Sequence, residues 1–422
     1  MSLKRQREKF FGIFWIFCII FLLAGIVTGK YIQKNINQEK ISDLEKTETS
    51  EERAVFDNYK LRGTIFDVKG RVLSYTHYQS KPQVMERHFC DSEPSLSKYA
   101  PVFSNLIDGF SPSKEGLDIL YEDILRKENI SKTKDDAVGL SVQLTADAEL
   151  SFSIYKLLYY INNSETFSSV LIMKPDGEIL TMLSTPTFNL ERYKYDLEYR
   201  TSYTESPALV NSNRHTDMID VSVFSKICSA YFNGSTVSDT GYNRLNKLIN
   251  ENFGFSAEPA DEKTFGVTDK NTIEVSDNDF IQLKVTPVYL AEMMSLCTTG
   301  NMYQASILKN TVDTNNFKNI SETAPKGRCI TSLPDDKVQA LRHEYSSICN
   351  EYPFNIKDGF SLYGDYIYGK NAEYILGSYI NDSSPEKSFI IVIKNEKREH
   401  TQSLYNMPEI FGGIIDILND YS

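Results

Sequence analysis

Residues 168–184 read SSVLIMKPDGEILTMLS, and this stretch decides the expected architecture. Two apolar runs, 168–174 and 178–184, flank a Pro-Asp-Gly turn at 175–177. Pro sets the backbone for a turn and Gly tolerates the positive φ that turns require. Two strand-like runs joined by so short a turn predict a β-hairpin at the centre of the fold.

Further strands and helices are expected on both sides of this hairpin. The segment 139–145 alternates like a strand, and Asp147 is placed to cap a helix that runs to about Ile161. Two more strands and a final apolar helix are predicted far downstream, at 372–380, 388–394 and 408–421. Strands, a helical middle, more strands and a last helix indicate one mixed sheet with helices on both faces.

The amino-terminal residues predict a membrane anchor. The run from Phe10 to Thr28 carries no charge, and at 1.5 Å per residue it spans about 28 Å, close to the hydrocarbon thickness of a bilayer. A cleaved signal peptide is the alternative, but this run is long and has a poor cleavage site. Four basic residues precede this run, namely Lys4, Arg5, Arg7 and Lys9. They favour a cytoplasmic amino terminus, with most of the chain outside the cell.

The predicted domain organisation starts from that anchor. A polar, charged stretch follows the anchor and suits a stalk, and a strand, turn and strand are predicted at 61–74. The expected parts are a cytoplasmic tail at 1–9, a transmembrane helix at 10–29, a stalk at 30–53, a small pedestal at 54–138 and a main domain at 139–422.

Composition excludes several classes of function. The chain of 422 residues is long enough for two or three domains. Its 57 acidic and 45 basic residues give a net charge of −12, the opposite of what a phosphate backbone requires, so nucleic-acid binding is not expected. The cysteines and histidines show no metal-ligand or disulfide pattern, so the cysteines are expected to be small buried side chains. No metal or cofactor is predicted.

Four segments carry motifs that occur together in one known family. They are RGTIFD at 62–67 with Gly70 and Leu73, LTAD at 144–147, GEILTMLSTPTF at 177–188, and VTP at 285–287 with Ala291 and Gly300. Their order behind an anchor resembles that of class B penicillin-binding proteins, the membrane-anchored D,D-transpeptidases that crosslink bacterial peptidoglycan. The resemblance implies an α/β (α+β) fold like that of penicillin-binding proteins and serine β-lactamases, with an antiparallel sheet flanked by helices.

The chemistry of that family uses the motifs S-x-x-K, S-x-N and K-T/S-G. A serine attacks a D-Ala carbonyl, a lysine takes its proton, and a strand receives the substrate carboxylate. Counting from PALVN at 207–211 places the nucleophile at Ser222. The base position holds Ser225, and Lys226 follows one residue late. A lysine at i+4 still lies near the serine on a helix, so Lys226 is either a displaced base or a solvated lysine.

The other two motifs are also altered. Ser238 is a weak remnant of S-x-N in a run that is typical of an exposed turn. The K-T/S-G strand is expected at 356–361, where Lys357 and Gly359 remain but Asp358 replaces the hydroxyl residue. These three residues are the predicted substrate-binding residues. A carboxylate there would repel a substrate carboxylate about 4 Å away by roughly 1 kcal/mol in water and roughly 4 kcal/mol at an effective dielectric of 20.

Changes in all three motifs predict a transpeptidase-like pseudoenzyme, because loss of nucleophile or base costs serine enzymes on the order of 10⁶-fold in rate. The leading hypothesis is a non-catalytic scaffold or regulator of cell-wall synthesis. The resemblance implies a SEDS-type glycan polymerase, or another cell-wall synthesis or division protein, as partner. Two alternatives stay open: an active D,D-transpeptidase that uses Ser222, and a module that binds stem peptide or glycan without turnover.

Overall fold

The computed structural model describes part of the chain. The described residues are 62–80, 83–90, 97–107, 116–126, 139–161, 167–203, 211–220, 226–227, 229, 272–275, 281–313, 328–346, 348–368, 372–396 and 406–421. The chain divides into two compact units, 1–60 and 61–422, and every described residue belongs to the second. The predicted tail, membrane helix and stalk therefore lie outside the described residues. Among the helices in the described part, none is long and apolar enough to cross a bilayer.

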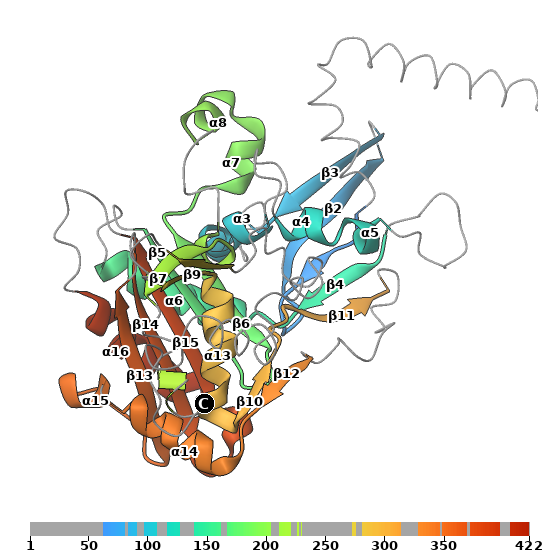
Figure 1. Cartoon of the computed structure of the whole chain (residues 1–422). Helices are drawn as coiled ribbons and strands as arrows, with labels where there is room; N and C mark the ends of the chain where they lie inside the picture. The colour runs from blue at the N-terminus through green and yellow to red at the C-terminus, as the bar shows by residue number, and fades with distance from the viewer. Residues whose placement is uncertain are drawn as a thin grey trace, which may run out of the picture. The chain divides into compact units, whose positions relative to one another are not determined.

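A five-stranded antiparallel sheet forms the centre of the second unit, in the order β13-β14-β15-β5-β6 (Figure 1). The predicted hairpin is confirmed, with Val170 of β5 opposite Leu183 of β6 and a positive φ of 92° at Gly177. The two strands predicted downstream are also confirmed, and they bring a distant part of the chain beside β5. The strands are β5 (Ser168–Met173), β6 (Ile179–Thr185), β13 (Phe360–Tyr368), β14 (Ala372–Asn381) and β15 (Phe389–Glu396).

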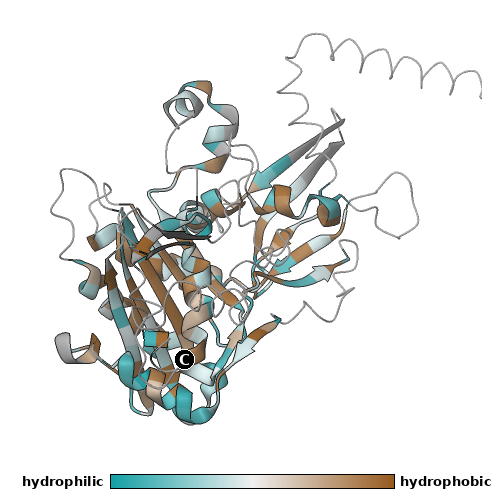
Figure 2. Ribbon diagram, viewed as in Figure 1, coloured by the Kyte–Doolittle hydropathy of each residue, from teal (hydrophilic) through white to brown (hydrophobic). Residues whose placement is uncertain are grey.

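Helices cover both faces of this sheet, as the sequence predicts. The helices α6 (Ala148–Ile161) and α16 (Met407–Tyr421) pack on one face and share an apolar core with it. The helix α13 (Pro287–Thr299) packs on the other face, in a second core. Figure 1 shows these layers, and Figure 2 shows the apolar strands that lie between them.

Local sequence signals start and stop two of these helices. Asp147 caps α6 as expected, because its Oδ1 accepts the backbone N–H of Glu149 at 3.0 Å. The side chain of Thr286 accepts the N–H of Tyr289 at 3.2 Å at the start of α13, and Gly300 ends that helix in the left-handed conformation. The residues from Pro287 to Thr298 are all buried, as expected for a helix that is apolar on most sides.

A second five-stranded sheet has the order β11-β4-β1-β2-β3. The strand, turn and strand predicted at 61–74 correspond to β1 and the start of β2, with Gly70 at a φ of 81° between them. Because β4 and β11 come from the predicted main domain, this sheet joins both sides of the predicted boundary after residue 138. The strands are β1 (Ile65–Phe66), β2 (Val72–Ser80), β3 (Gln83–Phe89), β4 (Ser141–Leu144) and β11 (Leu308–Val312).

An ionic network ties the second sheet to the helical layer. Arg71 lies 2.6 Å from Asp67 and 2.7 Å from Asp147, and both carboxylates are fully buried. Lys69 contacts Asp147 at 2.8 Å, and the Tyr421 hydroxyl donates to the same carboxylate at 3.0 Å. One aspartate therefore connects the β1–β2 turn, the start of α6 and the last described residue of α16.

Shorter elements surround these layers. The strands β7, β8 and β9 form a three-stranded sheet, and β10 pairs with β12. Cys90 and Cys297 are buried as expected, but Cys329 is the first residue of β12 and is exposed. The bounds are η1 (Ser97–Tyr99), α3 (Ala100–Ile107), α4 (Leu117–Leu120), α5 (Glu122–Leu125), α7 (Leu190–Tyr195), α8 (Leu197–Tyr203), η3 (Ser212–Arg214), β7 (Asp217–Asp220), β8 (Thr272–Val275), β9 (Ile281–Val285), β10 (Asn301–Tyr303), β12 (Cys329–Ser332), α14 (Asp335–Glu344), α15 (Ile348–Glu351) and η4 (Pro385–Lys387).

Candidate functional site

The edge strand β13 carries the best-defined part of the candidate site. Side chains alternate between the two faces of a strand. Leu362 and Tyr366 pack in the core on the α16 side, whereas Tyr363 and Ile367 pack in the core on the α13 side. Asp365 has the same parity as Tyr363 and Ile367, so its carboxylate belongs to the α13 face of the sheet.

Lys226 forms an ion pair with Asp365. Its Nζ lies 2.9 Å from Asp365 Oδ2, and the two side chains are 23% and 20% exposed. The same ammonium lies 5.0 Å from the centre of the Tyr345 ring, which adds a cation–π contact. Lys226 is therefore held against the edge strand instead of extending into solvent.

The strand β7 leads the chain toward this lysine. It pairs with β9, and the Tyr374 hydroxyl of β14 donates to the buried Asp217 of β7 at 2.9 Å. Lys226 follows six residues after the end of β7 at Asp220. The other predicted residues of this region, Ser222, Ser225 and Ser238, lie outside the described residues. Of these four predicted residues the structure describes Lys226, and the roles of all four stay predictions.

The outer edge of β13 is already hydrogen-bonded near Asp365. The N–H of Gly364 donates to the carbonyl of Tyr345 at 2.7 Å, and the thiol of Cys349 donates to the carbonyl of Leu362 at 3.2 Å. Burial raises the pKa of that thiol, which keeps it in the protonated form that can donate. An extended peptide that adds to a sheet edge needs these same backbone groups. The connection from α14 to α15 therefore occupies part of the edge.

The third predicted motif lies elsewhere on the strand. Lys357, Asp358 and Gly359 precede β13, which begins only at Phe360, so their expected placement within the strand is wrong. Asp-Gly favours a turn over a strand, and here Gly359 has a φ of 81° while Phe360 N–H donates to the carbonyl of Lys357 at 3.0 Å. Phe360 and Asp365 are five positions apart on the strand, about 17 Å at the usual rise.

Sequence reasoning missed Asp365, although the hairpin register could have identified it. In the structure β14 pairs with β13 so that Glu373 lies opposite Tyr368 and Gly377 lies opposite Gly364. The segment that resembles the family's strand after the third motif is therefore opposite 364–368 and not opposite 356–361. Pairing 372–376 with the preceding strand in this register would have placed Asp365 opposite Leu376, at the middle of the strand.

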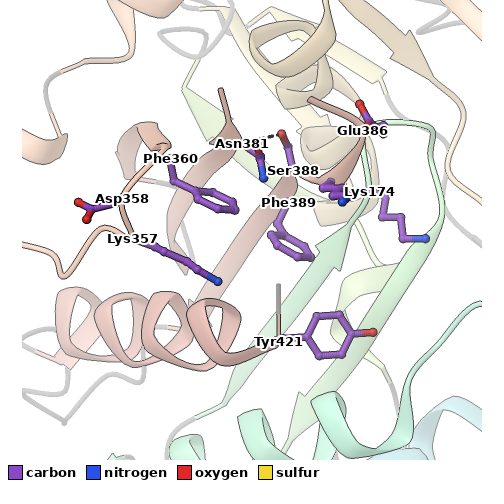
Figure 3. A pocket seen from close by; sticks show the side chains of 10 residues that line it. Lys174, Lys357, Asp358, Phe360, Asn381, Glu386, Ser388, Phe389 and Tyr421 are labelled. Atoms are coloured by element: carbon purple, nitrogen blue, oxygen red, sulfur yellow. Dashed lines mark hydrogen bonds between the residues drawn. The ribbon is translucent and has the colours of Figure 1, made fainter. Parts of the chain in front are cut away.

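A cavity of about 620 Å³ lies at the other end of β13, and the predicted Lys357 and Asp358 line it. Figure 3 shows Phe360 and Phe389 beside this cavity, with Lys357 between them and α16. Lys357 Nζ donates to the carbonyl of Asn419 at 2.9 Å, near the carboxyl end of α16. The cavity is lined by Lys174, Lys357, Asp358, Phe360, Asn381, Glu386, Lys387, Ser388, Phe389 and Tyr421.

Two buried groups of α13, Glu292 and Cys297, have altered titrations. Glu292 of α13 is buried, and burial raises the pKa of its carboxyl to about 7, although the hydrogen bond from Ala305 N–H at 2.8 Å partly lowers it. Burial also raises the pKa of Cys297 to about 12, against the opposing effect of the nearby Arg342 and Lys226 cations. Cys297 is therefore protonated at neutral pH and adds no negative charge near Lys226. Glu292 is mainly protonated below about pH 7.

Comparisons with known proteins support the fold and leave the chemistry open. No family model matches the chain, and no curated protein matches its sequence. The D,D-transpeptidase domain of a peptidoglycan glycosyltransferase from Eggerthella lenta is 15% identical, with a TM-score of 0.62, over 86% of this chain and 99% of that one. Penicillin-binding protein A of Mycobacterium tuberculosis, solved as an imipenem acyl-enzyme, is 13% identical with a TM-score of 0.64, over 86% and 99%.

Penicillin-binding protein 3 of the same organism is 14% identical with a TM-score of 0.64, over 85% of this chain and 96% of that one. These likenesses span nearly the whole length of the solved domains. The chain therefore has the D,D-transpeptidase fold of penicillin-binding proteins, as the resemblance in the sequence implies. At these identities the likeness is one of fold alone.

Proposed function

We propose that this chain is a penicillin-binding-protein-like component of peptidoglycan synthesis that does not itself transfer acyl groups. The observation that carries this proposal is the ion pair between Lys226 and Asp365 on the edge strand. It adds to the sequence changes in all three catalytic motifs.

The ion pair opposes both roles that a lysine would have in this site. To act as a general base, Lys226 would have to direct its amine at the serine oxygen, but its Nζ is engaged with Asp365 Oδ2 at 2.9 Å. To attract the carboxylate of a substrate, its charge would have to be uncompensated, but Asp365 neutralises it. A substrate carboxylate placed about 4 Å from Asp365 would meet a repulsion of roughly 4 kcal/mol at an effective dielectric of 20, which Lys226 would offset only in part.

The proposed setting is the outer face of the cell membrane. Support for it comes from the predicted transmembrane helix at 10–29 and its basic flank, and from the fold of the domain that follows. In this setting the chain acts as a scaffold or regulator for a SEDS-type glycan polymerase or for cell-division proteins. A pulldown of the anchored chain from its native membrane tests the partner: recovery of a wall polymerase or division protein is expected, and recovery of neither would reject this part of the proposal.

Covalent labelling with a fluorescent penicillin tests the absence of acyl transfer. The full chain should stay unlabelled under conditions that label an active penicillin-binding protein run in parallel. Labelling that disappears in Ser222→Ala would reject the proposal in favour of the alternative, an active D,D-transpeptidase that uses Ser222. Labelling that survives Ser222→Ala would reject both assignments, because it would place a nucleophile elsewhere.

A binding module without turnover is the second candidate function, and the cavity beside Lys357 favours it. Calorimetry with a D-Ala-D-Ala peptide tests the version in which Lys357 and Asp358 hold a stem peptide. Weak binding that improves in Asp358→Thr is the expected result, because the substitution removes a like charge. The absence of any heat in both proteins would reject stem-peptide binding.

A further inference from the structure

The cavity beside Lys357 is assembled from segments that are far apart in the sequence. Lys174 comes from the β5–β6 turn, Lys357 from the turn before β13, and Tyr421 from the end of α16. The stretch from Asn381 to Phe389 adds the β14–β15 connection. Clefts built by several segments at one end of a sheet are common places for small ligands.

The charge of this cavity differs from that of the chain. Three lysines and two carboxylates line it, in a protein whose net charge is −12. Figure 3 shows the Asp358 carboxylate turned away from the Phe389 ring, whereas the Lys357 ammonium lies on the inner side. Its contact with the Asn419 carbonyl holds this ammonium near the negative end of the α16 dipole.

Aromatic side chains give the cavity an apolar wall. Phe360 stacks on Tyr379 with ring centres 4.6 Å apart, and Phe389 meets Tyr421 edge to face at 6.2 Å. The Lys357 ammonium is 5.9 Å from the centre of the Phe360 ring. The aromatic rings can pack against a flat apolar face of a ligand, and the Lys357 ammonium can pair with an acidic group beside that face.

We infer that this cavity binds a small ring-bearing carboxylate, and that in a cell-wall protein its natural form is a muramyl sugar whose lactyl carboxylate carries no stem peptide. The ring would pack on Phe360 and Phe389, and the carboxylate would meet Lys357 with support from Lys174. Only the choice of a muramyl sugar rests on the proposed function. The expectation of a ring-bearing carboxylate rests on the residues that line the cavity.

The cavity is separate from the site around Lys226. Phe360 and Asp365 are about 17 Å apart along β13 and have opposite parity, so they serve opposite faces of the sheet. A ligand that packs on Phe360 would therefore lie on the face of the sheet opposite to the Asp365 carboxylate. The two sites can therefore be tested independently.

Ligand-detected NMR titrations of the full chain in detergent test the inference with a matched pair of sugars. N-acetylmuramic acid and N-acetylglucosamine share the ring and differ by a lactyl carboxylate. We expect the acid to bind at least about tenfold more tightly, and to weaken as salt rises. Equal binding of the two sugars, or no binding of either, would overturn the inference. Inorganic phosphate that competes as strongly as the acid would overturn it too, because the ring would then contribute nothing.

Lysine substitutions locate the binding. Lys357→Gln is expected to weaken binding of the acid by at least about tenfold, the usual scale for losing one charge-assisted hydrogen bond. Because Lys357 also contacts α16, its substitution could disturb the fold, and Lys174→Gln is therefore the second variant. Its affinity for the acid should fall by only about twofold, because Lys174 already pairs with Glu178 at 2.6 Å. Lys309→Gln on β11 is the matched control, with no change expected. Unchanged affinity in both cavity variants would overturn the inference. The absence of acyl transfer is tested separately by penicillin labelling, so failure of sugar binding would leave that part of the proposed function standing.

Discussion

Replacement of Asp365 by asparagine is the most informative perturbation of the candidate site. It keeps the shape of the side chain but removes the charge that faces Lys226 at 2.9 Å. Exposed ion pairs contribute about 0.2–1 kcal/mol, and removing one partner of a fully buried pair costs about 3–5 kcal/mol. The Lys226 and Asp365 side chains are about one-fifth exposed, so we expect Asp365→Asn to lower the free energy of unfolding by about 1–2 kcal/mol.

A double-mutant cycle separates the pair from its surroundings. Urea unfolding of the full chain, of Asp365→Asn, of Lys226→Met and of the double variant should give a coupling free energy of about 1 kcal/mol. The exposed pair Arg192–Asp196, with side chains 61% and 36% exposed, is the matched control and should give a clearly smaller coupling free energy. A coupling for Lys226 and Asp365 no larger than that of the control would refute the claim that this lysine is held on the strand.

Three further substitutions test the supporting structure. Burial raises the pKa of the Glu292 carboxyl to about 7, above its value in the unfolded chain. The contribution of Glu292 to the free energy of unfolding is therefore full below about pH 4.5 and is lost as pH rises through about 7. Glu292→Gln should therefore gain stability relative to the wild type between these values, by about 2–3 kcal/mol in urea unfolding, and a pH-independent difference would argue against this. Asp147→Asn should lower the free energy of unfolding by about 3 kcal/mol, because Arg71 loses one of its two carboxylate partners, at 2.7 Å. A loss under 1 kcal/mol in thermal unfolding would contradict the role of this ionic network. Gly177→Ala should cost more than about 2 kcal/mol, because φ is 92° and its Cβ would lie 2.4 Å from the Gln304 carbonyl oxygen; an unchanged melting temperature would disprove the turn geometry.

Much of the fold could be predicted because its signals are local. The hairpin at 168–184 follows from a turn tripeptide between two apolar runs, and the start of α6 follows from one capping aspartate. The helices on both faces follow from the order of the elements. The motifs shared with a known family then gave the expected antiparallel sheet, which the structure bears out.

The candidate site was harder to predict because it depends on pairing between distant segments. Asp365 is an unremarkable residue in a strand until the register of β13 against β14 places it in the middle of the edge. Lys357 and Gly359 suggested a catalytic motif by composition, but the Asp-Gly turn moved them off the strand. The spacing of residues around Lys226 in the sequence cannot reveal its ion pair, because its partner Asp365 lies 139 positions away.

Intact-protein mass spectrometry after prolonged exposure to benzylpenicillin tests the central claim most directly, because it detects even slow acylation of the full chain. The account predicts an unchanged mass for the wild-type chain, with Lys226 held by Asp365 and no base available to the predicted nucleophile. A stoichiometric penicilloyl adduct that maps to Ser222 would contradict it.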